Sequence, residues 1–160
     1  MVNKSKSDVI IGVISDTHGL LRSEIGRVFK GVDLIAHAGD IDRPEVLKSL
    51  REIAPVVAVR GNMDSSKWAG DIPPTETFEA GGIMMYMLHN LDAMDSDPKA
   101  AGFRVVISGH THLPLAEKKD GILFLNPGSA GPRRYDYPIS VALLRIRDKM
   151  PNVVFIELEL

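Results

Sequence analysis

Five short apolar runs in this chain each end beside a residue that is able to bind a metal ion. The residues that follow the five runs are, in chain order, Asp16 with His18, Asp40, Asn62, His89, and His110 with His112. A run that is apolar almost throughout is typical of a strand covered on both faces. In α/β proteins the carboxyl ends of such strands form the edge of the sheet where ligands bind. The pattern therefore predicts a fold in which the five run ends converge on one rim.

The first sixty residues alternate strand-like and helix-like segments. Three strands and two intervening helices are expected at residues 9–14, 20–29, 32–36, 44–50 and 56–59. Asp42 with Glu45 resembles a capping box, and Pro44 suits the first turn of the second helix. This βαβαβ order predicts parallel strand pairing with right-handed crossovers.

The rest of the chain is rich in strands and mostly antiparallel. Strands are expected at residues 75–80, 83–88, 104–108, 115–119, 122–125, 140–147 and 153–160. Gly81-Gly82 and Asp120-Gly121 mark turns between neighbouring strands, and residues 92–102 are expected to hold a short helix. So much strand in 160 residues predicts two sheets with helices outside them, in one domain that spans residues 1–160.

The composition excludes several classes of protein. With 19 basic and 21 acidic residues the net charge is -2, which gives no electrostatic reason to expect nucleic acid or an anionic membrane as a partner. The chain has no cysteine, so any metal must be held by His, Asp, Glu or Asn. The first apolar run is too short for a signal peptide or a membrane span, and we therefore expect a cytoplasmic protein.

Each polar motif has an ordinary interpretation when it is taken alone. The dipeptides Gly39-Asp40 and Gly61-Asn62 are common in turns. The pair His110 and His112 fits a metal site and a surface turn equally well, although residues i and i+2 of an extended chain do point the same way. The occurrence of all five motifs in order, at strand ends spaced by about two dozen residues, favours a single convergent site.

The ordered motifs "SDTHG", "AGD", "RGNMD", "LHN", "SGHTHLP" and "NPGS" resemble those of the calcineurin-like metallophosphoesterases. The resemblance is closest to the small single-domain phosphodiesterase branch, and it extends from Val9 to about Leu144. It implies an α/β fold, a four-layer αββα sandwich of two mixed β-sheets flanked by helices. It also implies two metal sites with a shared ligand. One site consists of Asp16, His18, Asp40 and His112, and the other of Asp40, Asn62, His89 and His110.

The chemistry of this family explains the residue types. Two metal ions about 3.5–4 Å apart can clamp the attacking and leaving oxygens of a phosphoryl transfer, and a bridging hydroxide is then the expected nucleophile. Such close cations need a bridging anion, which Asp40 supplies. Imidazole and carboxylate ligands suit two divalent transition-metal ions, manganese first, with nickel, iron, zinc or cobalt also compatible. The resemblance therefore implies a phosphoric ester hydrolase that cleaves small organic phosphodiesters, with Asp40, Asn62 and His89 as catalytic residues.

A different class of function stays open. A retromer subunit resembles this family in fold but works by binding protein partners, and it has lost part of the metal set. The alternative for this chain is therefore a non-catalytic scaffold. All seven ligand positions here carry a residue of the expected type, and this completeness at the level of the site favours the enzyme.

Several polar residues near the motifs have both a functional and a structural interpretation. His37 either contacts Asp40 and helps to orient it as a metal ligand, or is a hydrogen-bonded core histidine. Asp64 either orients the asparagine motif or caps a turn, and Ser15 and Thr17 are interpreted as turn formers.

Other residues lie farther from the motifs. Arg60, Arg133 and Arg134 either contact the substrate phosphate or are solvated. Trp68 either anchors an interface or packs over the domain, the second being favoured. The "NPGS" segment, residues 126–129, either lines the site or is an ordinary loop after a strand.

The two apolar runs near the end of the chain, residues 140–147 and 153–160, bear on assembly. An exposed sheet edge or apolar face there would join copies of the chain, although strands buried within the sandwich explain the runs equally well. Relatives are often dimers or larger. We therefore expect a homo-oligomer whose substrate is a small phosphodiester.

The sequence departs from the family pattern in three places. Many relatives read His-Gly-His where this chain has His89-Asn90-Leu91, and the segment between His89 and His110 is shorter than usual. Larger members have a histidine directly after the metal-binding asparagine, as a candidate proton donor to the leaving group. This chain has Met63 there, and a thioether has no proton to donate at neutral pH.

Without that acid, departure of the leaving oxygen depends on the metals and on its own stability as an anion. A general acid is worth about 10²–10⁴-fold, mainly for poor leaving groups. We therefore expect kcat/KM to depend steeply on leaving-group pKa across a series of methyl aryl phosphates. Met63→His should flatten this dependence. A shallow slope in the wild type would show that another group, such as His37 or a metal-bound water, already supplies the proton.

Overall fold

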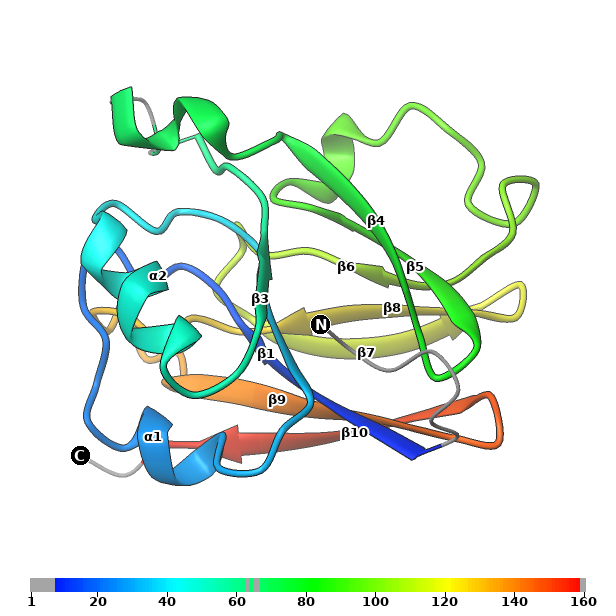
Figure 1. Cartoon of the computed structure of the whole chain (residues 1–160). Coiled ribbons are helices and arrows are strands. Elements are labelled where there is room, and N and C mark those ends of the chain that lie inside the picture. Colours follow the sequence, from blue (N-terminus) through cyan, green and yellow to red (C-terminus); the bar gives the residue numbers. More distant parts are fainter. Residues whose placement is uncertain (1–7, 63, 65–66, 159–160) are drawn as a thin grey trace.

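Ten strands build two five-stranded mixed sheets in the computed structural model, which describes residues 8–62, 64 and 67–158 (Figure 1). The first sheet has the order β10-β9-β1-β2-β3. Its strands are β1 (Asp8–Ile14), β2 (Leu34–His37), β3 (Val56–Ala58), β9 (Ser140–Arg147) and β10 (Met150–Glu157). The second has the order β4-β5-β6-β8-β7. Its strands are β4 (Thr75–Ala80), β5 (Ile83–Leu88), β6 (Phe103–Ile107), β7 (Pro114–Lys119) and β8 (Ile122–Pro127).

The strand directions confirm the prediction of a parallel first half. β1, β2 and β3 pair in parallel, as do β5, β6 and β8. The remaining pairs within the sheets are antiparallel. As a result, each sheet has three neighbouring parallel strands whose carboxyl ends lie on the same side of that sheet.

The main hydrophobic core lies between the two sheets. Alternate residues of β1, namely Val9, Ile11 and Val13, are fully buried in the same cluster as Met85 and Met87 of β5. Burial of apolar area at about 25 cal/mol per Å² is the dominant stabilising term for such a layer. The period of two in β1 thus packs one of its faces against the second sheet.

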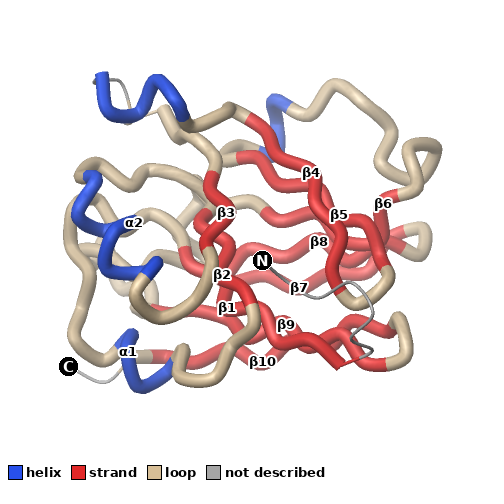
Figure 2. The backbone as a smooth tube through the Cα atoms, in the orientation of Figure 1, coloured by secondary structure: helices blue, strands red, loops and turns tan. Residues whose placement is uncertain are grey.

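The helices cover the outer face of the first sheet (Figure 2). They are α1 (Ile25–Val28) and α2 (Pro44–Arg51), and α2 packs Val46, Leu47 and Leu50 inward. The outer face of the second sheet is covered by the segment from 91 to 102, which contains the 3₁₀ helix η2 (Leu91–Ala93). The α/β sandwich of two mixed sheets flanked by helices is therefore confirmed, with a sparse outer layer on the second sheet.

Two helices are shorter than the sequence predicted. The expected helix at 20–29 is reduced to one turn, because the preceding residues follow the rim of the molecule: Arg22 donates to the carbonyls of Ala130 and Gly131 at 3.3 and 2.9 Å. The helix expected within 92–102 is only the three-residue η2, where the side chain of Asn90 accepts from the backbone of Asp92.

The last strand begins earlier than expected, at Met150. Asp148 and Lys149 both have positive φ and form a tight turn, which lets residues 150–152 pair with β9. β10 is an outer strand of its sheet, and Met150 and Val154 are each 55% exposed. The homo-oligomer stays a prediction. Among the described residues no helix is long and apolar enough to cross a bilayer.

The outer face of β1 generates a prediction about stability. A Cβ at Gly12 would lie 2.9 Å from the ring of Phe29, a fully buried side chain that has no room to move away. We expect Gly12→Ala to lower the free energy of unfolding by about 1–3 kcal/mol, measured by urea denaturation. Gly26→Ala is the matched control, because nothing lies within 4 Å of a Cβ there. Equal stability of Gly12→Ala and the wild type would contradict this close packing.

Candidate metal centre

The loops that follow the parallel strands of both sheets meet at one rim. The backbone N–H of Asp16, after β1, donates to Gly39, after β2, at 2.9 Å. The N–H of Gly109, after β6, donates to His89, after β5, also at 2.9 Å. A third bond joins the two sheets, because the N–H of His110 donates to the carboxylate of Asp16 at 3.0 Å. The convergence predicted from the sequence is therefore present.

Two buried carboxylates and three histidines lie at the centre of this rim. The Nε2 atom of His112 is 3.3 Å from Asp16 Oδ1, and that of His89 is 3.2 Å from Asp40 Oδ2. His18 Nε2 is 3.8 Å from both of these oxygens. One ring nitrogen of each histidine thus faces the carboxylates.

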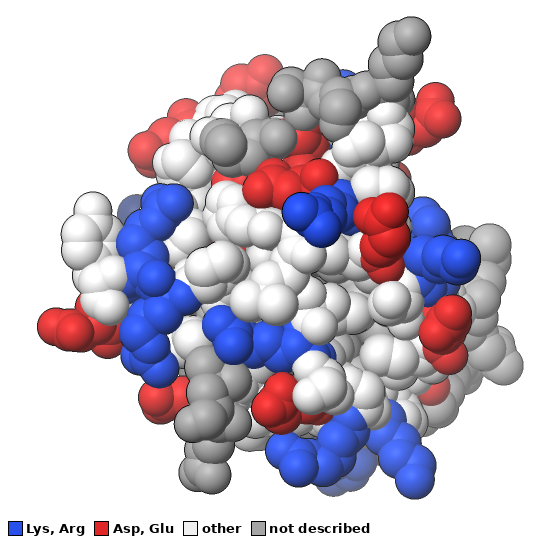
Figure 3. All heavy atoms as spheres, turned by 90° about the vertical axis from the view of Figure 1, so that its left-hand side faces the viewer, with Lys and Arg blue, Asp and Glu red and all other residues white. Residues whose placement is uncertain are grey.

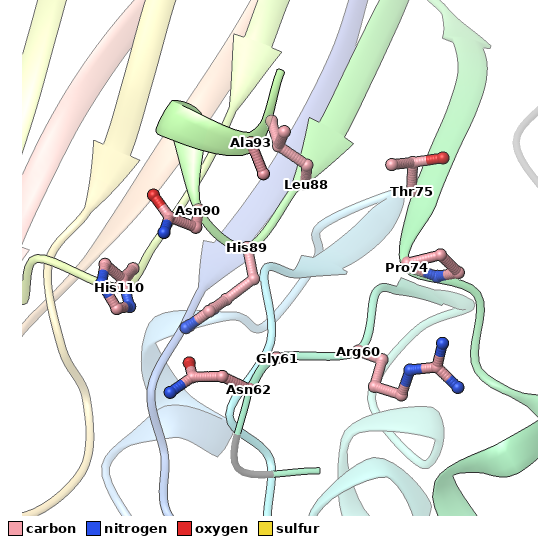
Figure 4. Close-up of a pocket in the computed structure, with 10 residues that line it drawn as sticks. All are labelled: Arg60, Gly61, Asn62, Pro74, Thr75, Leu88, His89, Asn90, Ala93 and His110. Carbon is pink, nitrogen blue, oxygen red and sulfur yellow. The ribbon is translucent and has the colours of Figure 1, made fainter. Parts of the chain in front are cut away.

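The remaining two predicted ligands lie on the open side of the rim. Asn62 and His110 are exposed and line a cavity of about 530 Å³ together with His89 (Figure 4). The rings of His110 and His89 meet edge to face, with 5.3 Å between their centroids. The structure therefore brings all seven predicted side chains to one place, five at its centre and two at its mouth.

Five buried side-chain atoms among the described residues lack a hydrogen-bond partner, and all belong to this cluster or to Asp42 beside it. They are Asp16 Oδ1, His18 Nε2, His89 Nε2, His112 Nδ1 and Asp42 Oδ1, and the first three are atoms of the candidate ligand groups that face the carboxylates. Leaving a polar atom buried and unpaired is costly, so such atoms in native proteins usually have a partner. Nitrogen and carboxylate oxygen atoms are suitable ligands for divalent transition metals. The residues present therefore fit the metal ions that the sequence motifs imply.

The ligand atoms form two overlapping groups, Asp16 with His18 and His112, and Asp16 with Asp40 and His89. Within each group the atoms lie within 4.8 Å of one another. Asp16 is common to both groups, whereas the resemblance placed Asp40 as the bridge. Asp40 Oδ2 does approach His18 and His89, which belong to different predicted sites. The bridging role of Asp40 stays a prediction.

Hydrogen bonds hold the carboxylate of Asp16 in its ionised form. Burial by itself raises the pKa of Asp16, but the close contact with His112, the hydrogen bond from Ser15 and the charges of His89 and His112 outweigh it, so that the pKa lies below its ordinary value. Ser15 Oγ donates to Asp16 Oδ2 at 2.6 Å. Ser15, interpreted above as a turn former, therefore helps to fix this carboxylate.

The protonation of two candidate ligands is set by their other ring nitrogen. His89 Nδ1 lies 2.8 Å from the carbonyl of Ala38, which only accepts, so Nδ1 carries a proton. Burial lowers the pKa of His89, but the close contact with Asp40, the charges of Asp16 and Asp40 and the hydrogen bond to the carbonyl of Ala38 raise it above its ordinary value. Because a metal ion binds only the neutral ring, the raised pKa makes protons compete with a metal ion for Nε2 as the pH falls.

Asp42 has a role that the sequence did not indicate. The predicted capping box is wrong: α2 has Arg43 as its N-cap, with no side-chain cap. Asp42 instead contacts His18, whose Nδ1 lies 3.2 Å from Asp42 Oδ2. A carboxylate there favours the tautomer in which Nδ1 is protonated and Nε2 is free to bind a metal. Only the folded loop brings Asp42 beside a histidine 24 residues earlier.

Asp64 joins the loop after β2 to the loop after β3. Its carboxylate accepts from the backbone N–H groups of Ile41, Asp42 and Gly61, at 2.8–3.1 Å. A Cβ at Gly61 would overlap the carboxylate of Asp40, so only glycine permits this approach. Asp64 thus positions Asp40 beside the asparagine motif, in agreement with its predicted orienting role.

His37 is a hydrogen-bonded core histidine. Its Nδ1 accepts from the N–H of Gly39 at 3.1 Å, and its Nε2 lies 3.0 Å from Thr17 Oγ1. Burial lowers the pKa of His37 to about 4, so the ring is neutral at pH 7. Its contacts are with the backbone and Thr17, and they stabilise the loops that carry Asp16 and Asp40.

Many of the candidate ligands have an unusual backbone conformation. Asp16, His18, Asp40, His110 and His112 all have φ between +49 and +75°. Side chains other than glycine rarely adopt this region, although Asp and His tolerate it better than most, and such residues cluster at functional sites. This backbone conformation makes the chain turn sharply after each strand, and the side chains at these turns lie at the rim.

The geometry agrees with a match to known proteins, because a sequence model of the calcineurin-like phosphoesterase superfamily domain matches residues 9–149. The chain belongs to the calcineurin-like phosphoesterase superfamily. It is 37% identical over 155 residues to a probable metallophosphoesterase of Methanocaldococcus jannaschii, covering 89% of this chain and 78% of that protein. A probable metallophosphoesterase of Methanothermobacter thermautotrophicus is 38% identical over 150 residues, covering 86% of each.

Solved structures share the fold of this phosphoesterase. An archaeal phosphodiesterase aligns with a TM-score of 0.77 and 24% identity, covering 92% of this chain and 100% of that one. Vacuolar Protein Sorting 29 of Cryptosporidium parvum aligns with a TM-score of 0.76 and 21% identity, covering 96% and 99%. At these identities the likeness shows the fold alone. Membership of the superfamily supports a hydrolase of phosphoesters that uses divalent metal ions.

The structure also decides between the interpretations left open for other residues of this phosphoesterase. Asn126, in the "NPGS" segment, donates to the carbonyl of Gly109 and to Thr111, which supports the turn that carries His110. Trp68 is partly buried and packs against the outer hydrophobic cluster. Met63, interpreted above as a missing acid, lies outside the described residues.

The three distal arginines differ in their surroundings. Arg133 and Arg134 are exposed, and Arg133 donates to the backbone carbonyl of Tyr137 at 3.2 Å. Arg60, in contrast, lines the same cavity as Asn62 and His89. The structure therefore places Arg60 at a cavity beside the rim.

The contact between His18 and Asp42 generates a prediction. Asp42→Ala removes the carboxylate that favours the metal-binding tautomer of His18, and we expect it to weaken Mn²⁺ binding about 10–100-fold. Calorimetric titration of chelator-treated protein measures this affinity. The control is Asp95→Ala, which removes an exposed carboxylate from the 91–102 segment. Unchanged affinity in Asp42→Ala would show that the 3.2 Å contact does not orient His18.

Proposed function

We propose that this chain is a metal-dependent phosphodiesterase that hydrolyses small organic phosphodiesters, with two divalent transition-metal ions, manganese first. Asp16, His18, Asp40 and His112 would hold one ion, and Asp40, Asn62, His89 and His110 the other. The observation that carries the proposal is the placement of three buried atoms without a hydrogen-bond partner, Asp16 Oδ1, His18 Nε2 and His89 Nε2, in two overlapping groups of candidate ligands that share Asp16. When bound, the metal ions would activate water and neutralise the charge of the phosphoryl group.

The burial of the ligands defines the side from which a substrate approaches. Asp16, Asp40, His89 and His112 are at most 5% exposed, so the centre is closed behind them. His110 is exposed and forms part of the cavity wall. A phosphodiester in this cavity would therefore meet the centre from the side of His110 and Asn62, with Asp16 and Asp40 beneath it.

The charges of the ligands favour an anionic substrate. Two carboxylates, Asp16 and Asp40, would be the charged ligands of the loaded site, because a histidine that binds a metal does so as neutral imidazole and the amide of Asn62 is uncharged. Two dications would exceed these two negative charges, which leaves the loaded site positive for a phosphodiester anion. On the face over α1 and α2, Lys and Arg form separate groups with Asp and Glu between them, without the continuous basic surface that suits a polyanion (Figure 3). This agrees with a small substrate.

The alternative of a non-catalytic scaffold has the likeness to Vacuolar Protein Sorting 29 in its favour. That likeness concerns the fold alone. A scaffold has no need for two buried carboxylates whose surroundings leave polar atoms unpaired, and such groups destabilise a fold unless a ligand compensates them. The completeness of the ligand set therefore favours the enzyme.

The predicted bridging role of Asp40 supplies the test. We expect about two metal ions per chain after incubation with Mn²⁺, and hydrolysis of bis(4-nitrophenyl) phosphate. Asp40→Ala should remove both ions and reduce hydrolysis to the background rate. Asp136→Ala, which removes an exposed carboxylate, should change neither. Elemental analysis and the release of nitrophenolate are the measurements. A wild-type protein without metal after incubation with Mn, Ni, Fe and Zn would refute the enzyme.

A further inference from the structure

Two cavities flank His110 and share it, together with Asn90, as a common wall. The larger, of about 530 Å³, contains Arg60 and is called the Arg60 cavity below. The smaller, of about 160 Å³, contains Leu91 and Leu115 and is called the leucine cavity. A phosphodiester has two organic arms, and a phosphate beside His110 would lie between two spaces of different size and chemistry.

The Arg60 cavity has a cationic far end. In Figure 4 the side chain of Arg60 points away from His89 and Asn62, and its guanidinium lies on the side of Pro74. The backbone of Arg60 is fixed, since its N–H donates to Pro73 at 2.8 Å. Among the described residues the guanidinium forms no ion pair. A guanidinium recognises carboxylate and phosphate groups through paired hydrogen bonds. It therefore suits an anion separate from the phosphate at the metal ligands.

The leucine cavity is unsuited to an anion. Leu91 and Leu115 are 37% and 48% exposed, and Phe124 adds an aromatic ring to the wall. Its acidic side chain, Asp92, would repel a negative charge. The volume is about that of a cavity that holds one benzene ring. The space therefore suits a single apolar or aromatic group.

We propose that the substrate is an asymmetric phosphodiester whose larger arm carries a second anionic group, a carboxylate or a phosphate, and whose smaller arm is apolar. The second anion pairs with Arg60, and the apolar arm lies against Leu115. This inference rests on the proposed function, because it takes the phosphate to lie at the candidate metal ligands. Arg60 is thus a specificity-determining residue at the end of the substrate remote from the reacting bond.

A pair of substrates that differ only in one charge tests this assignment. They are 4-nitrophenyl 4-carboxybutyl phosphate and its uncharged carboxamide, 4-nitrophenyl 4-carbamoylbutyl phosphate. Both present the same aromatic leaving group to the leucine cavity. With Mn²⁺-loaded wild-type protein we expect kcat/KM to be roughly 10-fold higher for the carboxylate, as a charge-assisted pair would give.

Variants on the two sides of His110 separate the two arms. Arg60→Gln should bring the two kcat/KM values to within about twofold, and Arg60→Lys should keep part of the preference because the charge is retained. Leu115→Asn should lower both values together and leave the preference intact. Arg104→Gln, which removes an exposed arginine of β6, is the matched control and should behave as the wild type.

Dissociation constants keep this inference distinguishable from the proposed function. The 4-nitrobenzylphosphonate analogues of the two esters have a P–C bond in place of the scissile P–O bond and do not turn over. Calorimetry should show tighter binding of the carboxylate, and Arg60→Gln should abolish the difference. If diesters are cleaved but the two ligands give equal kcat/KM and Kd, the inference is overturned and the proposed function stands. If no diester is cleaved, the proposed function fails, and the Kd values alone then support or overturn the assignment of Arg60.

Discussion

The burial of two carboxylates side by side is the constraint on which the rest of this structure depends. Asp16 and Asp40 are at most 4% exposed, and two like charges in such a place are unstable without compensation. Part of the compensation is local, since Ser15 and the backbone N–H of His110 donate to Asp16. The remainder is a ring of imidazole nitrogens at 3.2–3.9 Å, which are also suitable metal ligands.

The architecture serves this cluster in a specific way. The parallel strands of both sheets end at a common rim, where their loops meet. Backbone hydrogen bonds join those loops to one another, independently of the side chains. Asp64 then ties the loop of Asp40 to that of Asn62 through three backbone N–H groups. The left-handed turns at the candidate ligands are tolerated because these bonds over-determine the loops around them.

The buried side of the rim and its solvent-exposed side would serve different parts of the function. The buried carboxylates and histidines exclude solvent from behind the centre, as a preorganised site requires. Asn62 and His110 stand at the mouth, and the two cavities that share His110 differ in charge and size. In this arrangement the centre would determine the reaction and the cavities the choice of substrate, so the two properties can change independently.

The sequence by itself determined the strand order of the first half, the two-sheet sandwich and all seven rim residues, since apolar runs and the polar residues after them are local patterns. It failed where a residue's role depends on a distant partner. Asp42 has the local signature of a cap but contacts His18, 24 residues earlier. The helix expected at 20–29 shortens because Arg22 is held by carbonyls more than a hundred residues away. Tertiary structure also decided that Arg60 lines a cavity at the rim. The physical reason is the same in each case: local sequence sets backbone preference and burial, whereas hydrogen bonds and cavities arise only when segments far apart in the chain are packed together.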